Sequence, residues 1–170
     1  MLLFLESNQC NEGADVAFVI DSSENVTRLA YQREKDFVKE LMRRLVEKRN
    51  NLNAAAVIYS NKAFVKLNFS QGFSLQNFNF VIDMLPYLGG KRTIRSPTDS
   101  TVDQLFRPVF IGPRTHLPKV AIQLMYFTDR GVIATPFITF KDRRISTVQL
   151  YAAFFLSSRL RNYSCSEGHW

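Results

Sequence analysis

The sequence predicts an α/β layer fold with a mainly parallel sheet, because buried strands alternate with amphipathic helices. Residues 16–20 and 119–127 are long apolar runs of the kind found in strands buried on both faces. Each run ends abruptly in polar residues, Asp21 in the first case and Thr128 and Asp129 in the second. Segments with the apolar spacing of helices lie between the predicted strands, and such alternation favours a layered α/β architecture.

The first half of the chain begins with a strand at 15–21, followed by an amphipathic helix at 27–47 whose apolar residues recur with helical spacing. After a turn, small and apolar residues at 54–59 indicate a second buried strand. A short connection leads to 63–69, which is expected to be a strand with one solvated face, antiparallel to its predecessor.

The second half begins with two predicted helices. The first runs from 75 to about 85, with Ser74 as its N-cap and Pro86 after its end. The second runs from 102 to about 110 and leads through a proline-rich loop to the strand at 119–127. Further along, the apolar segment at 148–156 is compatible with either a helix or a strand.

Length and composition indicate a single folded domain. The chain has 170 residues, of which 46% are apolar, enough for one sizeable core. Its 22 basic and 15 acidic residues give a net charge of +7, which favours acidic partners without choosing among them. No apolar run is long enough to span a membrane. Residues 1–5 are too short for a signal-peptide core, so the chain is expected to be either cytosolic or cut from a longer precursor.

Cysteine and asparagine patterns favour an extracellular protein. Cys10 and Cys165, one near each end, either form a disulfide that ties the termini together or are unrelated free thiols. Three Asn-x-Ser/Thr acceptors for N-linked glycosylation tilt the balance toward secretion, at Asn25, Asn68 and Asn162.

Several motifs come in the order and spacing of a von Willebrand factor A domain. They are Asp-Val-Ala-Phe-Val-Ile-Asp-Ser-Ser-Glu-Asn at 15–25, Ala-Ala-Ala-Val-Ile-Tyr-Ser at 54–60, Pro-Tyr-Leu-Gly-Gly at 86–90 and Phe-Thr-Asp at 127–129. The segment that starts at Cys10 and the helix that ends at Leu45 look most like the A domains of collagen type VI and related matrix collagens.

This resemblance implies a doubly wound sheet with helices on both faces, formed by residues 15–131. Residues 1–14 are then a lead-in, and residues 132–170 are a tail that does not match the family. The tail is expected either to complete or cap the domain, or to leave it truncated at its C-terminal end.

The resemblance also implies a metal-ion-dependent adhesion site at the carboxyl ends of the strands. Mg²⁺, or Mn²⁺ or Ca²⁺, would be held by side-chain oxygens, the ligands that these ions prefer. The matching positions are Asp21, Ser23, Asn25, Thr93 and Asp129, with Thr98 as an alternative to Thr93.

Departures from the family pattern argue against a bound cation. Asn25 stands where the family has a serine, and a glycan on Asn25 would exclude the metal. Arg130 follows Asp129 where the family has glycine. The loop after the two glycines is basic, and its positive charge repels a cation; its basic residues are Lys91, Arg92 and Arg95.

The favoured function is a non-enzymatic extracellular adhesion or matrix-assembly module that binds matrix proteins such as collagens. A second hypothesis is a module that binds sulfated glycosaminoglycan, since the helix at 27–47 and the residues after it are rich in basic side chains. The residues concerned are Arg33, Lys39, Arg43, Arg44, Lys48 and Arg49. The same charges are also compatible with an ordinary solvated helix face.

A third hypothesis is a Mg²⁺-dependent enzyme that handles phosphate, because aspartates at strand ends also organise that chemistry. The sequence has no Walker-type glycine-rich loop and no zinc-binding pattern, so an enzyme is not expected. Nucleic acid is not expected as a partner.

Overall fold

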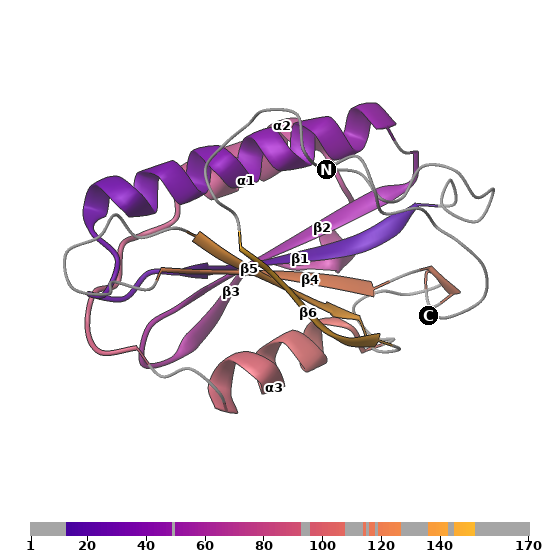
Figure 1. Ribbon diagram of the computed structural model, residues 1–170. Helices are drawn as coiled ribbons and strands as arrows, with labels where there is room; N and C mark the ends of the chain where they lie inside the picture. Colours follow the sequence, from indigo (N-terminus) through magenta and orange to yellow (C-terminus); the bar gives the residue numbers. More distant parts are fainter. Residues whose placement is uncertain are drawn as a thin grey trace.

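A computed structural model of the chain describes residues 13–48, 50–92, 96–107, 114, 116–117, 119–126, 136–142 and 145–151 (Figure 1). In chain order the elements are β1 (Ala14–Asp21), α1 (Arg28–Lys48), β2 (Leu52–Tyr59), β3 (Ala63–Leu67), the 3-10 helix η2 (Phe69–Gln71), α2 (Leu75–Asp83), α3 (Ser96–Leu105), β4 (Lys119–Tyr126), β5 (Pro136–Asp142) and β6 (Ile145–Tyr151). None of the described helices is long and apolar enough to cross a membrane.

The sheet has a parallel centre and antiparallel edges. Its strand order is β3-β2-β1-β4-β5-β6. β1 pairs in parallel with β2 and with β4, whereas β3, β5 and β6 each run antiparallel to the strand that they join. The predicted α/β fold with parallel central strands is therefore confirmed.

Helices cover both faces of the sheet, with α1 and α2 on one side and α3 on the other (Figure 1). The side chains of β1 alternate between the two layers: Phe18 and Ile20 join the core under α1 and α2, and Val19 joins the core under α3. Because both faces are covered, every residue of β1 is buried, and this explains its unbroken apolar run.

Most predicted elements are present with small differences at their ends, but α3 differs more. It begins at Ser96 rather than at residue 102, and it ends at Leu105 rather than near 110. The sequence pattern assigns Pro97 to a loop. Proline is well tolerated in the first turn of a helix, however, because the N–H that it lacks has no partner there.

The chain beyond residue 131 contributes strands to the same sheet. β5 pairs antiparallel with β4, and β6 pairs antiparallel with β5, so both sides of β4 have main-chain partners. The segment for which helix and strand were both open is a strand as far as Tyr151. The proposed division into a domain at 15–131 and a tail at 132–170 stays a prediction.

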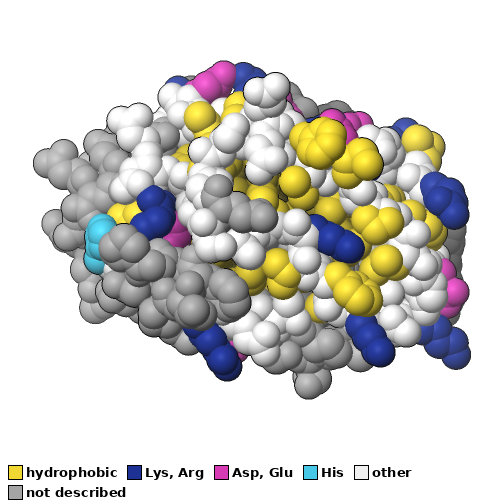
Figure 2. Space-filling model, turned by 180° about the vertical axis from the view of Figure 1, so that it is seen from behind, with side chains coloured by type: hydrophobic (Ala, Val, Ile, Leu, Met, Phe, Trp, Pro, Cys, Tyr) yellow, Lys and Arg dark blue, Asp and Glu magenta, His cyan; other side chains and the backbone are white. Residues whose placement is uncertain are grey.

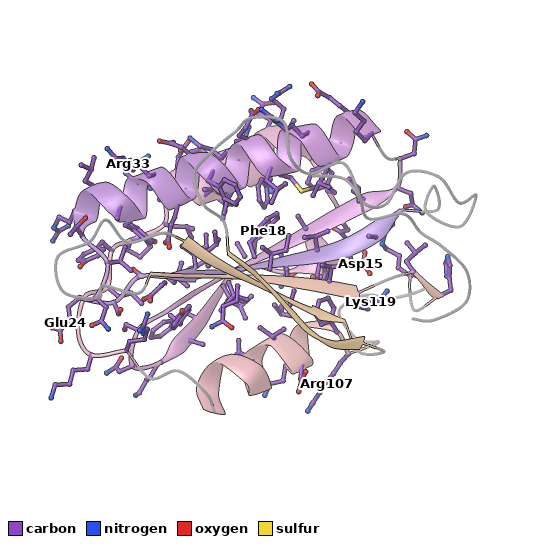
Figure 3. The ribbon with its side chains drawn as sticks, in the orientation of Figure 1. Asp15, Phe18, Glu24, Arg33, Arg107 and Lys119 are labelled. Atoms are coloured by element: carbon purple, nitrogen blue, oxygen red, sulfur yellow. The ribbon has the colours of Figure 1, made fainter. Side chains whose placement is uncertain are left out.

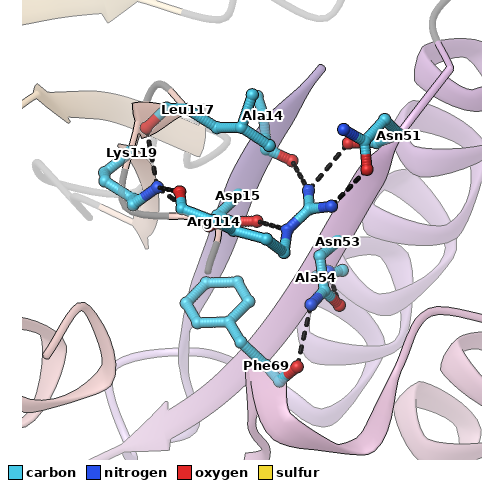
Figure 4. Close-up of polar contacts among 9 residues, drawn as sticks. All are labelled: Ala14, Asp15, Asn51, Asn53, Ala54, Phe69, Arg114, Leu117 and Lys119. Atoms are coloured by element: carbon cyan, nitrogen blue, oxygen red, sulfur yellow. Dashed lines mark hydrogen bonds and ion pairs between the residues drawn. The ribbon is translucent and has the colours of Figure 1, made fainter. Parts of the chain in front are cut away.

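A buried ion-pair cluster closes the end of the sheet at which β1 begins (Figure 4). Asp15 is fully buried, and its carboxylate lies 2.7 Å from Arg114 Nε and 3.0 Å from Lys119 Nζ. The register of β1 with β4 sets Asp15 opposite Lys119, which explains their contact. Lys119 Nζ also donates to the main-chain carbonyls of Arg114 and Leu117, each at 2.6 Å.

Arg114 ties this end to the turn between α1 and β2. Its guanidinium donates to the side-chain and main-chain carbonyls of Asn51 (Figure 4). Gly13 passes the same turn with φ +100°, and a Cβ there would lie 2.3 Å from the carbonyl oxygen of Asn51. Only glycine fits this approach.

The substitution Asp15→Ala is expected to lower the free energy of unfolding by about 3–5 kcal/mol, because it leaves two mostly buried cations without their counter-ion. Urea unfolding monitored by circular dichroism measures the change. Glu24→Ala removes an exposed carboxylate at the other end of the molecule and should change stability by less than about 0.5 kcal/mol. Equal effects of the two substitutions would contradict a stabilising role for the cluster.

Candidate functional site

The polar residues that follow β1 lie at the opposite end of the molecule from the Asp15 cluster. Figure 3 shows Glu24 at one end of the sheet and both Asp15 and Lys119 at the other. β1, β2 and β4 run in parallel, so the loops that follow them meet at one edge. In open α/β sheets, this edge is where ligands bind.

Asp21 is the last residue of β1 and is fully buried. Its Oδ1 accepts a hydrogen bond from the main-chain N–H of Ser23 at 2.9 Å, and Ser23 Oγ accepts one from the N–H of Asn25 at 3.4 Å. These side chains satisfy loop amides and turn the chain toward α1. Thr27 then caps the helix, since its Oγ1 accepts from the N–H of Ala30 at 3.1 Å.

Ser22 fastens the loop after α2 onto the loop after β1. Its hydroxyl donates to the carbonyl of Pro86 at 3.0 Å and accepts from the N–H of Leu88 at 2.7 Å. Its own carbonyl accepts from the N–H of Gly89 at 2.8 Å. One residue therefore fixes the position of three residues of the other loop.

Two glycines let this second loop pass along the first. Gly89 and Gly90 have φ values of +66° and +75°, in the region that favours glycine. The carbonyl of Gly90 accepts from the N–H of Glu24 at 2.9 Å. The Tyr87 hydroxyl donates to the carbonyl of Val26 at 2.7 Å and closes the other side of the contact.

The same loop brings Arg92 onto Asp21. Arg92 Nη1 lies 3.0 Å from Asp21 Oδ2, and the two side chains are only 8% and 0% exposed. Both carboxylate oxygens of Asp21 are therefore engaged, one by a main-chain amide and the other by a guanidinium. Tyr59 is opposite Asp21 in the register of β1 with β2, and burial together with the Asp21 charge raises the pKa of its hydroxyl.

Comparison with known proteins identifies the family. The sequence model of the von Willebrand factor type A domain matches residues 15–131, well over half of the chain. The chain belongs to this family.

The relatives of this A domain are distant. It is 23% identical over 141 residues to von Willebrand factor A domain-containing protein 2 of Xenopus laevis, a match that covers 82% of this chain and 18% of that protein. The chain thus spans less than a fifth of that relative's length.

A solved structure from the mussel byssus, that of proximal thread matrix protein 1 with a zinc-occupied MIDAS motif, superposes with a TM-score of 0.57 at 22% identity. The superposition covers 72% of this chain and 31% of the mussel protein, and it supports the fold. MIDAS denotes the metal-ion-dependent adhesion site that the resemblance of this sequence implies.

The described part of that site does not fit a divalent cation in this arrangement. A cation held by Asp21 would lie beside the guanidinium of Arg92, and two cations repel strongly where solvent is excluded. Among the described residues, no cluster of three or more His, Cys, Asp and Glu side chains could hold a metal. Thr93 and Asp129, the remaining predicted ligands, lie outside the described residues, and for Thr98 only the helical backbone is described.

A second buried carboxyl lies beneath the site. Glu34 on α1 is 1% exposed, and neither of its oxygens has a hydrogen-bond partner among the described residues. Burial, and then the charge of Asp21, raise the pKa of this carboxyl well above its ordinary value, so the neutral form is favoured. Nearby, Tyr31 donates its hydroxyl to the carbonyl of Pro86 at 2.9 Å, and burial raises its pKa to about 12.

The basic residues proposed to bind polyanions are largely matched by acids. Lys39 Nζ lies 2.6 Å from Asp83 and 3.3 Å from Asp36. Arg43 and Arg44 both contact Glu40, and their hydrogen bonds lower its pKa to about 2. Arg33 and Lys48 are exposed, while Arg49 lies outside the described residues.

The predicted modification sites are described only in part. Asn25 is exposed, as an acceptor for a glycan must be. Asn68 caps η2, with its Oδ1 accepting from the N–H of Ser70 at 3.1 Å. Asn162, Cys10 and Cys165 lie outside the described residues, so the third glycan and the disulfide stay predictions.

The sequence motif locates Asp21 and Ser23 but not the residues that hold the site together. Ser22 stands between Asp21 and Ser23 but is not among the predicted ligands. The positive charge of Arg92 is visible in the sequence as repulsive to a metal, whereas its pairing with Asp21 is not. Glu34 resembles one charge of a solvated helix among many, although it recurs with Tyr31 and Val38 at core spacing, and that spacing is the available signal.

The substitution Glu34→Met is expected to raise the free energy of unfolding at pH 7 by about 1–3 kcal/mol, because it removes a buried carboxyl without partners. The unfolded pKa is near the ordinary 4.5 and the folded pKa is higher, so wild-type stability should fall as the pH rises between these two values. The advantage of the variant should therefore be small near pH 4 and grow toward neutral pH. Urea unfolding across this range measures it.

Glu40→Met is the matched control on the same helix. The folded pKa of Glu40 is lowered to about 2, so its stabilising contribution is present above pH 4.5 and is lost as the pH falls toward 2. Between pH 4.5 and neutral pH the control should therefore differ from wild type by a constant amount, and this difference should shrink only below pH 4.5. A pH-independent difference between Glu34→Met and wild type would show that Glu34 has an ordinary pKa in the folded protein.

Proposed function

We propose that this A domain is a non-enzymatic extracellular adhesion or matrix-assembly module of the collagen type VI-like kind. It binds another matrix protein, such as a collagen, through the loops at the carboxyl ends of β1, β2 and β4. Membership of the A-domain family supports a role in protein–protein contact. The mussel byssus protein is by name a matrix protein, which agrees with a matrix setting.

The observation that carries the proposal is a pair of exposed leucines at this end. Leu29 is 63% exposed and Leu88 is 37% exposed. The residues that precede them, Arg28 and Tyr87, contact each other, with the guanidinium 4.7 Å from the ring centroid. This cation–π contact brings the two segments that carry the leucines together. Exposed large apolar side chains are typical of protein-binding surfaces.

Exposed apolar side chains also occur away from the loops. Seen from behind, hydrophobic side chains gather on the surface with lysines and arginines among them (Figure 2). Outside the loop end, the large exposed apolar residues of the described chain belong to β3 and to the end of α2 or the residue after it: Phe64, Val65, Phe80 and Met84. They provide controls of similar exposure for the proposed binding surface.

Extracellular location, glycans on Asn25, Asn68 and Asn162, and the Cys10–Cys165 disulfide belong to the same proposal. The exposed position of Asn25 supports a glycan there. Binding by the apolar surface needs no metal ion at Asp21, Ser23, Asn25, Thr93 and Asp129.

Glycosaminoglycan binding by α1 is the second candidate. It is favoured by the net charge of +7, and it is weakened by the ion pairs that neutralise Lys39, Arg43 and Arg44. The two candidates differ in salt dependence, because polyanion binding weakens steeply as ionic strength rises.

The substitution Leu29→Ser is expected to weaken binding to immobilised fibrillar collagen at least tenfold, because it removes an exposed apolar anchor. Biosensor titration in chelator at two salt concentrations measures the affinity. Phe80→Ser is the matched control, since Phe80 is 64% exposed but lies on α2, and it should bind like wild type.

Two other outcomes would contradict collagen binding by the loop end. Unchanged binding in Leu29→Ser, or loss in Phe80→Ser alone, would place the binding surface outside the loop end. Failure to bind collagen, together with retention on heparin that disappears at high salt and is reduced by Arg33→Ser, would favour the glycosaminoglycan hypothesis.

A further inference from the structure

We propose that Arg92 supplies, from within the chain, the positive charge that a divalent metal would otherwise supply at Asp21. The loops of this A domain are then held together without a metal, and Asp21 does not bind a divalent metal. This inference concerns the chain alone and does not require a binding partner. Its test is therefore independent of the test of the proposed function.

Asp21 and Arg92 form a buried pair of opposite charge. The side chain of Asp21 is 0% exposed, and a carboxylate removed from water needs a compensating charge nearby. Arg92 provides it at 3.0 Å and is itself only 8% exposed, so the pair is internal and not a surface contact screened by salt. Between these two side chains the negative and positive charges cancel.

The loop that carries Arg92 is held in place before it reaches the site. Ser22 fixes it through contacts with Pro86, Leu88 and Gly89. The segment that carries the Arg92 guanidinium is therefore hydrogen-bonded to the motif that contains Asp21. Lys91, the preceding residue, is exposed, so the two basic neighbours have different environments.

Glu34, the second buried carboxyl, has no positively charged side chain paired with it among the described residues. Glu34 is 1% exposed, and neither of its carboxyl oxygens has a hydrogen-bond partner in the part of the chain that the structure describes. The described side chains instead provide charge compensation for Asp21 alone.

Thermal unfolding of the folded chain, first in chelator and then in excess Mg²⁺ or Mn²⁺, tests the inference. Wild type should show the same midpoint in all three conditions. Arg92→Ala should lower the unfolding midpoint in chelator by roughly 10 °C, because it leaves the buried Asp21 carboxylate without an opposite charge. Mn²⁺ should then recover roughly 5–10 °C, because the vacated position admits a cation that binds the native state.

Lys91→Ala is the matched control. It removes one positive charge from the same loop without uncovering Asp21, so its midpoint should stay near that of wild type and should not respond to metal. Arg92→Lys keeps a cation at the site; it should be less destabilised than Arg92→Ala and should also fail to respond. The double variant Asp21→Asn/Arg92→Ala should lose the metal response of Arg92→Ala.

Two results would overturn the inference. The first is a midpoint of the wild-type chain that rises with Mn²⁺ and does not rise in Asp21→Asn, since Asp21 would then be open to metal. The second is an Arg92→Ala protein that folds cooperatively and whose midpoint does not rise with metal. If Arg92→Ala does not fold, Mn²⁺ electron paramagnetic resonance of the wild-type chain decides: no bound ion supports the inference, and one bound ion lost in Asp21→Asn overturns it.

Discussion

The burial of the Asp21 carboxylate at the end of the central strand is the constraint on which the surrounding structure depends. β1 has covered layers on both faces, so the first polar side chain after its apolar run is enclosed by protein. Desolvation of an ionised carboxylate is costly unless hydrogen bonds and an opposite charge compensate it. The N–H of Ser23 and the guanidinium of Arg92 provide both. The loop at 86–92, which Ser22 anchors, brings that guanidinium to this place.

Each end of the sheet has a buried aspartate whose charge is compensated by basic side chains. At one end Asp15 is compensated by Arg114 and Lys119, and at the other Asp21 is compensated by Arg92. In each case the cation comes from a loop or strand far away in sequence, so the pair also fixes a long-range connection. The Asp15 cluster fastens the β4 side and the α1–β2 turn, and the Asp21 pair fastens the loop after α2. The side chains of Leu29 and Leu88 belong to neither pair and are exposed at the loop end.

Much of the fold could be predicted from sequence because its signals are local. The apolar run of β1, the helical spacing of α1 and the Ser74 cap each depend on neighbouring residues only. The predicted start of α3 was wrong because proline is common both in loops and in the first turn of helices, and the local sequence around Pro97 does not distinguish the two. The strand nature of β6 could not be chosen from a short apolar run, since only pairing with β5 decides it. The candidate ligands were visible in the motif, whereas the Arg92 pair and the burial of Glu34 arise from packing between distant segments.

Metal adhesion sites and internal ion pairs are alternative ways to stabilise the same buried acid, and the structure of this A domain has the second. The proposed binding surface around Leu29 and Leu88 would then act through apolar contacts whether or not divalent ions are present. The most direct test is a crystal structure of the chain grown in Mn²⁺, with an anomalous difference map around Asp21. We expect the guanidinium of Arg92 beside Asp21 Oδ2 and no anomalous peak there. A peak coordinated by Asp21 and Ser23, with Arg92 turned away, would contradict the internal ion pair.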